Sequence, residues 1–325
     1  PRPKRRVPSR FQSTTPSSRD RAKFSIQTTG RDQVKKTTSA PPRVIATSTP
    51  TVGPDALGAS VSFVRPSHTL PISLTGTNCA LECAHCGGRY LEGMVPIEQA
   101  CADGYTSCLI SGGCDPRGRV PLGTSLDKLS ELHSGRLFNW HVGLASEQDI
   151  RPILPYLDVV SFDVVGDDRT IKEVYGLDVT VADYRRTYTM LRRYGRVVPH
   201  LTLGLYGGEW RGESRALEWL ADVGLESLVL LVIIPTPGTR YASCQPPSVS
   251  SVVAFIEQTR CTLHDVPVYL GCMRPGGRYR RELDPLAVAA GVSKVVNPTR
   301  AAIEMASTQG LSVRWESECC AMRLP

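Results

Sequence analysis

Long apolar runs are absent from this sequence, as are the common nucleotide-binding motifs. No stretch of the 325 residues approaches the roughly 18 uncharged apolar residues of a membrane-spanning helix. We therefore expect a cytoplasmic protein without membrane contacts. No Gly-x-Gly-x-x-Gly or P-loop sequence is present, so nicotinamide-dependent and nucleotide-hydrolysing functions have no supporting motif. The 11 cysteines are an odd number and no signal-peptide segment accompanies them, which argues against a secreted disulfide framework.

Acidic residues are scarce in the first 50 positions, which hold 12 Lys and Arg against only Asp20 and Asp32, together with 15 Ser and Thr. This net charge of +10 leaves −3 for the remainder, which has 26 basic and 29 acidic residues. Such a segment buries too little apolar surface to offset the entropy of ordering, so residues 1–55 are predicted to be a disordered, non-catalytic basic tail. Organellar targeting by the tail stays open, as does the natural N-terminus, because the chain begins at Pro1. No interleaved aromatic residues support nucleic-acid binding.

Beyond residue 66, strand-like and helix-like segments alternate. Apolar runs predict strands at 71–76, 107–111, 139–145, 158–164, 197–205, 227–234, 266–272 and 293–297. Helical patterns between them include 125–133, 181–194, 214–223, 249–261 and 298–309. Eight β-then-α units of this length match the size of a TIM-type (β/α)8 barrel. We predict such a barrel for residues 66–310, followed by a C-terminal extension at 311–325.

Three cysteines follow the first predicted strand, in a C-x3-C-x2-C spacing formed by Cys79, Cys83 and Cys86. Three thiolates can ligate three irons of a [4Fe–4S] cluster and leave the fourth iron open. The open iron can bind S-adenosylmethionine (SAM), whose reductive cleavage begins radical chemistry. A structural zinc site is the alternative, but zinc usually takes four N or S ligands and no second pair lies nearby. The spacing therefore favours a cluster.

This cysteine motif resembles the signature of the radical SAM superfamily. The next predicted strand ends in Gly112 and Gly113, whose lack of side chains lets the backbone approach a ligand. The segment is similar to the family's Gly-Gly-Glu, which meets the amino group of SAM. Here the sequence departs from the family, because Cys114 replaces the glutamate, and Asp115 is the candidate for that contact instead. A plain βα turn is the alternative.

Two later strand ends fit the same resemblance. The segment ending in Glu209 is similar to the family's Gly-x-Ile-x-Gly-x-x-Glu motif, beside the adenine and ribose. Thr236 and Thr239 lie in Pro-Thr-Pro-Gly-Thr, which looks like the corresponding loop of the biotin-synthase-like branch, and they offer hydroxyl groups. His85 stands where the family often places an aromatic residue against the adenine. A loop histidine with a single hydrogen bond is the alternative for His85.

A second group of cysteines lies in the distal half of the chain. Cys272 ends the seventh predicted strand, and Cys319 and Cys320 are adjacent near the end of the sequence. We predict that these three hold an auxiliary iron–sulfur cluster, with Cys114 as a further candidate ligand. The adjacent cysteines form a redox pair in the alternative interpretation. The remaining ones are interpreted as small hydrophobic residues: Cys101, Cys108, Cys244 and Cys261.

The cysteine loop, the segment Gly271–Gly277 and the Cys-Cys pair look like the archaeal-type two-component lipoyl synthases. That resemblance covers nearly all of residues 66–322. It implies sulfur insertion into unactivated C–H bonds of an octanoyl-lysyl carrier protein, with the auxiliary cluster as sulfur source. It also implies a second radical SAM subunit and an electron donor such as ferredoxin or flavodoxin. A methylthiolase, a methyltransferase or a metal-cofactor maturation enzyme is the alternative; a non-catalytic iron–sulfur or zinc interaction protein is a more distant one.

Overall fold

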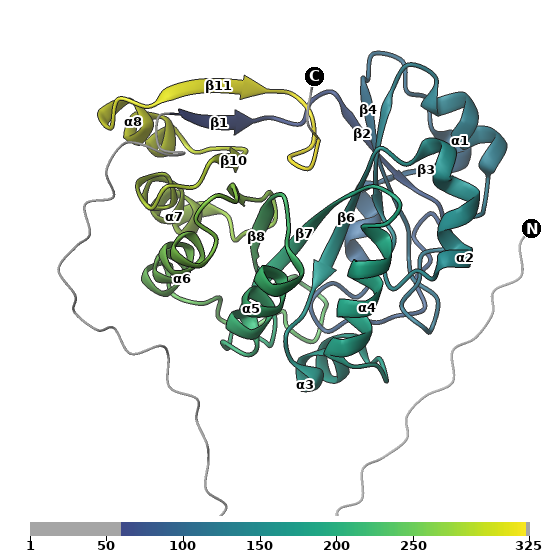
Figure 1. Ribbon diagram of the computed structural model, residues 1–325, viewed down its shortest axis with the longest axis horizontal. Helices are drawn as coiled ribbons and strands as arrows, with labels where there is room; N and C mark the ends of the chain where they lie inside the picture. Colours follow the sequence, from purple (N-terminus) through teal and green to yellow (C-terminus); the bar gives the residue numbers. More distant parts are fainter. Residues whose placement is uncertain (1–59, 323–325) are drawn as a thin grey trace, which may run out of the picture. The chain divides into compact units, whose positions relative to one another are not determined.

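The computed structural model describes residues 60–322, and a single sheet of parallel strands dominates this part of the chain (Figure 1). The strands are β1 Ser60–Val64, β2 Thr69–Ser73, β3 Val95–Pro96, β4 Ser107–Ser111, β5 Leu137–His141, β6 Val159–Val164, β7 Arg196–Leu203, β8 Leu228–Val232, β9 Val268–Leu270, β10 Lys294–Val296 and β11 Ser312–Glu316. The predicted basic tail at residues 1–55 lies outside the described residues.

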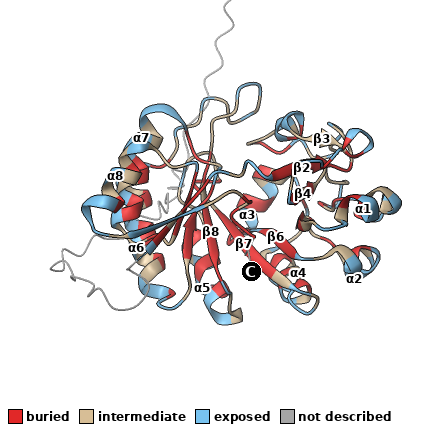
Figure 2. Ribbon diagram, turned by 90° about the horizontal axis from the view of Figure 1, so that it is seen from above, coloured by how far each residue is buried: buried red, intermediate tan, exposed pale blue. Residues whose placement is uncertain are grey.

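Helices follow most of the strands and cover the outer face of the sheet. They are α1 Leu126–His133, α2 Glu147–Ile150, α3 Asp168–Thr170, α4 Val181–Leu191, α5 Glu213–Val223, α6 Val249–Thr262, α7 Gly277–Ala289 and α8 Arg300–Thr308. Their inner faces are apolar and buried against the strands, whereas their outer faces are exposed (Figure 2). No helix within residues 60–322 is both long and apolar enough to cross a membrane.

The predicted alternation of strands and helices is confirmed, but the closed eight-stranded barrel is wrong. All eight predicted strands are present, and β1, β3 and β11 are additional. Within the described residues the strand order is β11-β1-β10-β9-β8-β7-β6-β5-β4-β2-β3, with every neighbouring pair parallel. The sheet therefore has two ends, β11 and β3, and forms an open, curled half-barrel.

The short connection between β1 and β2 explains why the sheet curls. These strands are consecutive in the chain, yet they lie near opposite ends of the sheet. Only the residues between Val64 and Thr69 join them, and an extended chain spans at most about 3.6 Å per residue. The two ends of the sheet must therefore come within about 18 Å of each other. We call the space that the curled sheet encloses the lumen.

The segment after β11 fills the gap between the two ends of the sheet, which we call the seam. The backbone N–H of His68 donates to the Ser317 carbonyl at 3.0 Å. Glu318 is buried and its carboxylate accepts hydrogen bonds from the hydroxyls of Thr69 on β2 and Ser107 on β4. These bonds stand where a closed barrel would have hydrogen bonds between strands, so the seam segment replaces a direct strand pairing.

The lumen has its own small apolar core, which is separate from the main one. Inward-facing valines of five strands pack there with Tyr269 and with Cys320, Ala321 and Met322. The guanidinium of Arg196 on β7 donates to the Ala321 carbonyl at 2.6 Å. The last described residues thus plug the lower lumen, and the carboxyl ends of the strands are left to line a cavity.

Candidate active site

A cavity of about 530 Å³ occupies the lumen at the carboxyl ends of the strands. This volume lies within the range of roughly 300–1,000 Å³ that small-molecule sites usually have. Nine of the thirteen predicted site residues line it: Cys79, Cys83, His85, Cys86, Gly112, Gly113, Cys272, Cys319 and Cys320. The two cysteine groups, far apart in sequence, therefore face one cavity.

The cysteine loop after β2 turns back on itself through two glycines. Gly87 and Gly88 have φ angles of +51° and +76°, which residues other than glycine rarely adopt. At Gly88 a β-carbon would lie 3.7 Å from the Cys79 Cβ, so the two ends of the loop are in contact. The thiol of Cys83 donates to Cys86, which lowers the pKa of Cys86 to about 7. The same hydrogen bond, together with burial, raises the pKa of Cys83.

The loop after β4 packs closely on the cysteine loop and is hydrogen-bonded to it. A β-carbon at Gly113 would lie 1.9 Å from the Asn78 carbonyl oxygen and 2.5 Å from the Cys79 Cα, so only glycine fits. The Gly113 N–H donates to Thr75 Oγ1 at 2.7 Å, and the Ala80 N–H donates to the carbonyl that follows Gly113, at 2.8 Å. The close contact predicted for this glycine pair is therefore made with the cysteine loop itself.

Asp115 and Glu209 are not among the residues that line the cavity. The Asp115 carboxylate accepts from the backbone N–H groups of Arg117 and Arg119, at 2.8 and 3.0 Å, and so holds its own turn. Glu209 is exposed. These placements do not favour the predicted contacts with SAM. A buried carboxylate nearby is that of Glu213, the first residue of α5, which accepts from the Gly204 N–H at 2.9 Å.

Thr236 and Thr239 shape a turn that packs on the cysteine loop, and neither lines the cavity. Thr239 Oγ1 donates to the Thr236 carbonyl at 2.8 Å. Thr236 Oγ1 lies 3.2 Å from the Tyr90 hydroxyl. The Tyr241 N–H donates to the Ala84 carbonyl at 3.0 Å. Both threonines therefore support the cysteine loop from the side of β8, which is an indirect role compared with the predicted one.

His85 lies on the cavity wall between two tyrosines. Its ring centroid is 6.0 Å from that of Tyr90 and 5.7 Å from that of Tyr175, both in edge-on arrangements. Its Nδ1 is buried without a hydrogen-bond partner among the described residues. Burial lowers the pKa of His85 to about 4, so the ring is neutral at physiological pH. A neutral ring in this position is suited to apolar contact with a ligand, as the resemblance implies.

The distal cysteines lie deeper in the lumen. The Asn139 side-chain amide donates to Cys319 Sγ at 3.3 Å, and Ser161 holds that amide with a bond of 2.9 Å. The Cys320 thiol donates to Cys319 and lowers its pKa to about 7. Cys272 interacts electrostatically with Cys319 and is accessible from the cavity. The structure thus brings these three cysteines together.

A polar layer on β5 to β7 was missed by the sequence reasoning. His141, Asp163 and His200 line the cavity between the two cysteine groups. The two imidazole rings are 5.5 Å apart, and burial lowers the pKa of each to about 4. Asp163 is exposed to the cavity, where desolvation raises the pKa of its carboxyl although His200 opposes the shift. The available signal was the presence of polar residues at alternate positions in otherwise apolar strands.

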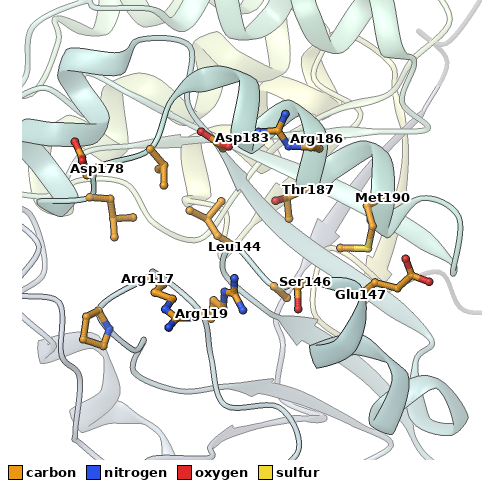
Figure 3. Close-up of a pocket in the computed structure, with 14 residues that line it drawn as sticks. Arg117, Arg119, Leu144, Ser146, Glu147, Asp178, Asp183, Arg186, Thr187 and Met190 are labelled. Carbon is orange, nitrogen blue, oxygen red and sulfur yellow. Dashed lines mark hydrogen bonds and ion pairs between the residues drawn. The ribbon is translucent and has the colours of Figure 1, made fainter.

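A second cavity of about 530 Å³ lies away from the cysteines, between the loops after β4 and β5 and helix α4 (Figure 3). Its charged side chains are largely paired within the protein. Arg119 lies 3.3 Å from Asp149, and Arg186 pairs with Asp183. It contains no cysteine. The lumen cavity is therefore the better candidate for chemistry.

Within residues 60–322, no three His, Cys, Asp or Glu side chains meet in the geometry of a site for one metal ion. The thiolates of a [4Fe–4S] cluster are spread over separate irons, so a cluster needs a wider arrangement. The three soft thiol donors of the cysteine loop fit such a cluster in chemistry, and their present geometry is not that of a tetrahedral zinc site.

No protein-family model matches the sequence, and no curated protein matches it in sequence. In structure, the chain is similar to methylornithine synthase (PylB), with a TM-score of 0.57 and 12% identity over 80% of this chain and 86% of that one. It is also similar to the FeFe-hydrogenase maturase HydG from Carboxydothermus hydrogenoformans, with a TM-score of 0.55 and 13% identity over 75% of this chain and 60% of that one. These likenesses establish the shared fold.

Proposed function

We propose that this chain is a radical SAM enzyme, which holds a [4Fe–4S] cluster on Cys79, Cys83 and Cys86 and cleaves SAM reductively. One observation carries the proposal: the three thiols lie on a single loop at the wall of a ligand-sized cavity, at the carboxyl edge of a parallel sheet. Active sites of parallel α/β barrels gather at this edge. The two enzymes that share the fold are radical SAM enzymes, which agrees with the resemblance in sequence.

Different residues of the cavity would bind the cluster and SAM. The three cysteines provide thiolates, and a bound cluster supplies the electron that cleaves SAM. Gly112 brings bare backbone to the cavity wall beside the cysteine loop, and His85 offers a neutral ring. The curled sheet surrounds the site, and a water-poor site strengthens its electrostatic interactions and limits side reactions of a reactive intermediate.

The proposal is tested by the variant in which Cys79, Cys83 and Cys86 are all alanine. We expect it to lose dithionite-dependent formation of 5′-deoxyadenosine from SAM and to remain folded, because none of the three cysteines belongs to the main apolar core. A variant with Cys101→Ala and Cys261→Ala is the matched control, since both thiols are exposed outside the cavity. Cleavage of SAM by the triple variant would contradict the proposal.

A more specific proposal, which names the reaction and the substrate, is sulfur insertion into an octanoyl-lysyl carrier protein, as in lipoyl synthases. Its support is that Cys272, Cys319 and Cys320 face the same cavity as the cysteine loop. An auxiliary iron–sulfur cluster on these thiolates would stand within the lumen as a source of sulfide. A second radical SAM subunit and a ferredoxin or flavodoxin are the proposed partners of this reaction.

The finer proposal has its own test. The variant with Cys272, Cys319 and Cys320 changed to alanine should keep SAM cleavage, lose one of two clusters by iron and sulfide analysis, and transfer no sulfur to an octanoyl-lysyl peptide. A single cluster in anaerobically prepared wild-type protein would exclude this auxiliary-cluster proposal. In that case the metal-cofactor maturation alternative becomes the better one, because HydG, which shares the fold, is a maturase.

A further inference from the structure

Four thiols, rather than three, gather at the upper wall of the lumen. Cys114 lines the cavity together with Cys79, Cys83 and Cys86. Cys114 interacts electrostatically with Cys79 and Cys86, and it acts on Cys83 in the same way. The four thiols therefore form one group that lines a single cavity.

The fold holds Cys114 in this group by its backbone. Gly113 is pressed so closely on the cysteine loop that a β-carbon there would lie 2.5 Å from the Cys79 Cα. The Cys114 carbonyl accepts the Ala80 N–H at 2.8 Å, which fixes the next peptide as well. Cys114 therefore lines the cavity beside the cysteine loop, because its own backbone is already bonded to that loop.

No other side chain of that loop takes the place of Cys114. Asp115, the neighbouring acid, is turned away from the cavity and holds Arg117 and Arg119 through their backbone N–H groups. The position facing the three cysteines is therefore occupied by a soft sulfur donor, which suits iron–sulfur ligation better than recognition of an ammonium group.

We propose that Cys114 is the fourth thiolate ligand of the cluster when SAM is absent, and that SAM displaces it on binding. This inference rests on the proposed radical SAM function. In the exchange, the bond between iron and the Cys114 sulfur breaks, and bonds from the SAM amino nitrogen and carboxylate oxygen to the same iron form. The SAM ammonium must lose one proton to bind, and the released Cys114 thiolate accepts it. No electron is transferred in this step.

Two consequences follow for the resting protein. An iron bound by three sulfides of the cluster and by the Cys114 thiolate would have four ligands and no open position for a small molecule. Cys114 would therefore protect the cluster until SAM binds. SAM also has to compete with the thiolate, and its apparent affinity is reduced by the fraction of molecules in which the iron is closed. Removal of Cys114 should therefore open the iron to other ligands and strengthen SAM binding.

The test compares anaerobically reconstituted wild type, Cys114→Ala and Cys114→Ser, with Cys261→Ala as a control that removes an exposed thiol outside the cavity. Iron and sulfide content is measured first. Electron paramagnetic resonance spectra of the reduced cluster are then recorded with and without imidazole, which binds only an open iron. We expect imidazole to change the spectrum of Cys114→Ala and to leave those of wild type and Cys261→Ala unchanged. Cys114→Ser should lie between.

SAM titration of the same spectra gives a second readout, independent of turnover. We expect Cys114→Ala to bind SAM at least about tenfold more tightly than wild type, which corresponds to a closed iron in nine of ten resting molecules. Equal responses to imidazole in wild type and Cys114→Ala, with intact clusters and SAM cleavage, would overturn the role of Cys114 and leave the proposed function standing. Wild type that holds zinc instead of iron would overturn both.

Discussion

The guanidinium of Arg274 forms a two-bonded ion pair with the carboxylate of Asp284, at 2.8 and 2.9 Å, and both side chains are fully buried. Arg274 also donates to the Gly271 carbonyl at 2.5 Å, and Asp284 accepts the Thr299 N–H at 3.0 Å. The pair therefore ties the loop after β9, which carries Cys272, to α7 and to the start of α8. It fixes one wall of the cavity from behind.

Breaking this pair should cost a large part of the stability of the fold. Arg274→Met leaves the buried Asp284 carboxylate without its ion-pair partner and with only the Thr299 N–H as a hydrogen-bond donor, which typically costs about 3–5 kcal/mol. Urea unfolding followed by circular dichroism measures the loss. Arg300→Met, which breaks the exposed pair with Glu304, is the control and should cost less than about 1 kcal/mol. Similar losses in the two variants would show that the buried pair has no special role.

Gly113→Ala should disconnect the two loops that hold the cysteines. The new β-carbon would overlap the Asn78 carbonyl oxygen at 1.9 Å, and backbone on both sides leaves no flexible atom to move away. We expect reconstituted iron content to fall severalfold while the secondary structure is retained. Gly276→Ala is the control, because a β-carbon there has no neighbour within 4 Å and the φ of −80° suits alanine. Normal iron content in Gly113→Ala would contradict the close packing described here.

Glu318→Ala should weaken the seam. The variant removes the acceptor of hydrogen bonds from Thr69, Thr106 and Ser107, and each buried donor left without a partner costs about 1–3 kcal/mol. Because Thr69 and Ser107 also bond each other at 2.8 Å, we expect a total near the lower end of that range. Glu304→Ala, at an exposed position on α8, is the control for thermal unfolding. A melting temperature unchanged in Glu318→Ala would rule out this role for the carboxylate.

The buried histidines should make the stability depend on pH. Burial, followed by the neighbouring His141, lowers the pKa of His200 to about 4, whereas an unfolded chain has a value near 6.5. Between about pH 6.5 and 4 the unfolded state therefore binds more protons, and the free energy of unfolding falls as the pH is lowered. This shift sets an upper limit of roughly 3 kcal/mol for His200, which is largely buried.

The comparison of wild type with His200→Asn isolates this contribution. Unfolding by urea at a series of pH values should show a shallower decline for the variant between pH about 6.5 and 4. His85 and His141 keep their lowered pKa values in the variant, and Asp163, whose pKa is raised, acts in the opposite direction in both proteins. Parallel curves for the two proteins would mean that the pKa of His200 is nearly the same in the folded and unfolded states, which would contradict the prediction.

Buried parallel strands could be predicted from the sequence because both of their faces are apolar, and they therefore read as continuous apolar runs. The strand β11 gave no such signal. Four of its five residues are exposed, and Trp315 packs against Phe63 and Arg65 near the start of the described residues. A solvated strand held by one neighbour on one side has the pattern of a surface loop, which is why the sheet has more strands than predicted.

Local spacing predicted the cysteine loop, but distant packing decided the rest of the site. The sequence predicts that Asp115 contacts SAM, but its carboxylate accepts hydrogen bonds from backbone N–H groups of the turn that follows it. Glu318 reads as a surface charge, since its hydroxyl partners on Thr69 and Ser107 lie more than 200 positions away. His200 stands alone in an apolar strand, and only the curl of the sheet brings it beside His141. Such contacts depend on topology, which periodicity does not specify.

The seam also has a consequence for folding kinetics. The hydrogen bond between Thr69 and Glu318 closes a loop of 249 positions, and the entropy of closing long loops delays such contacts until much of the sheet is formed. We therefore expect the seam to be absent from the folding transition state. Weakening it through Glu318→Ala should speed unfolding and leave the refolding rate nearly unchanged, as a chevron plot can measure. The seam would then slow the unfolding of the folded protein and have little influence on the rate at which it folds.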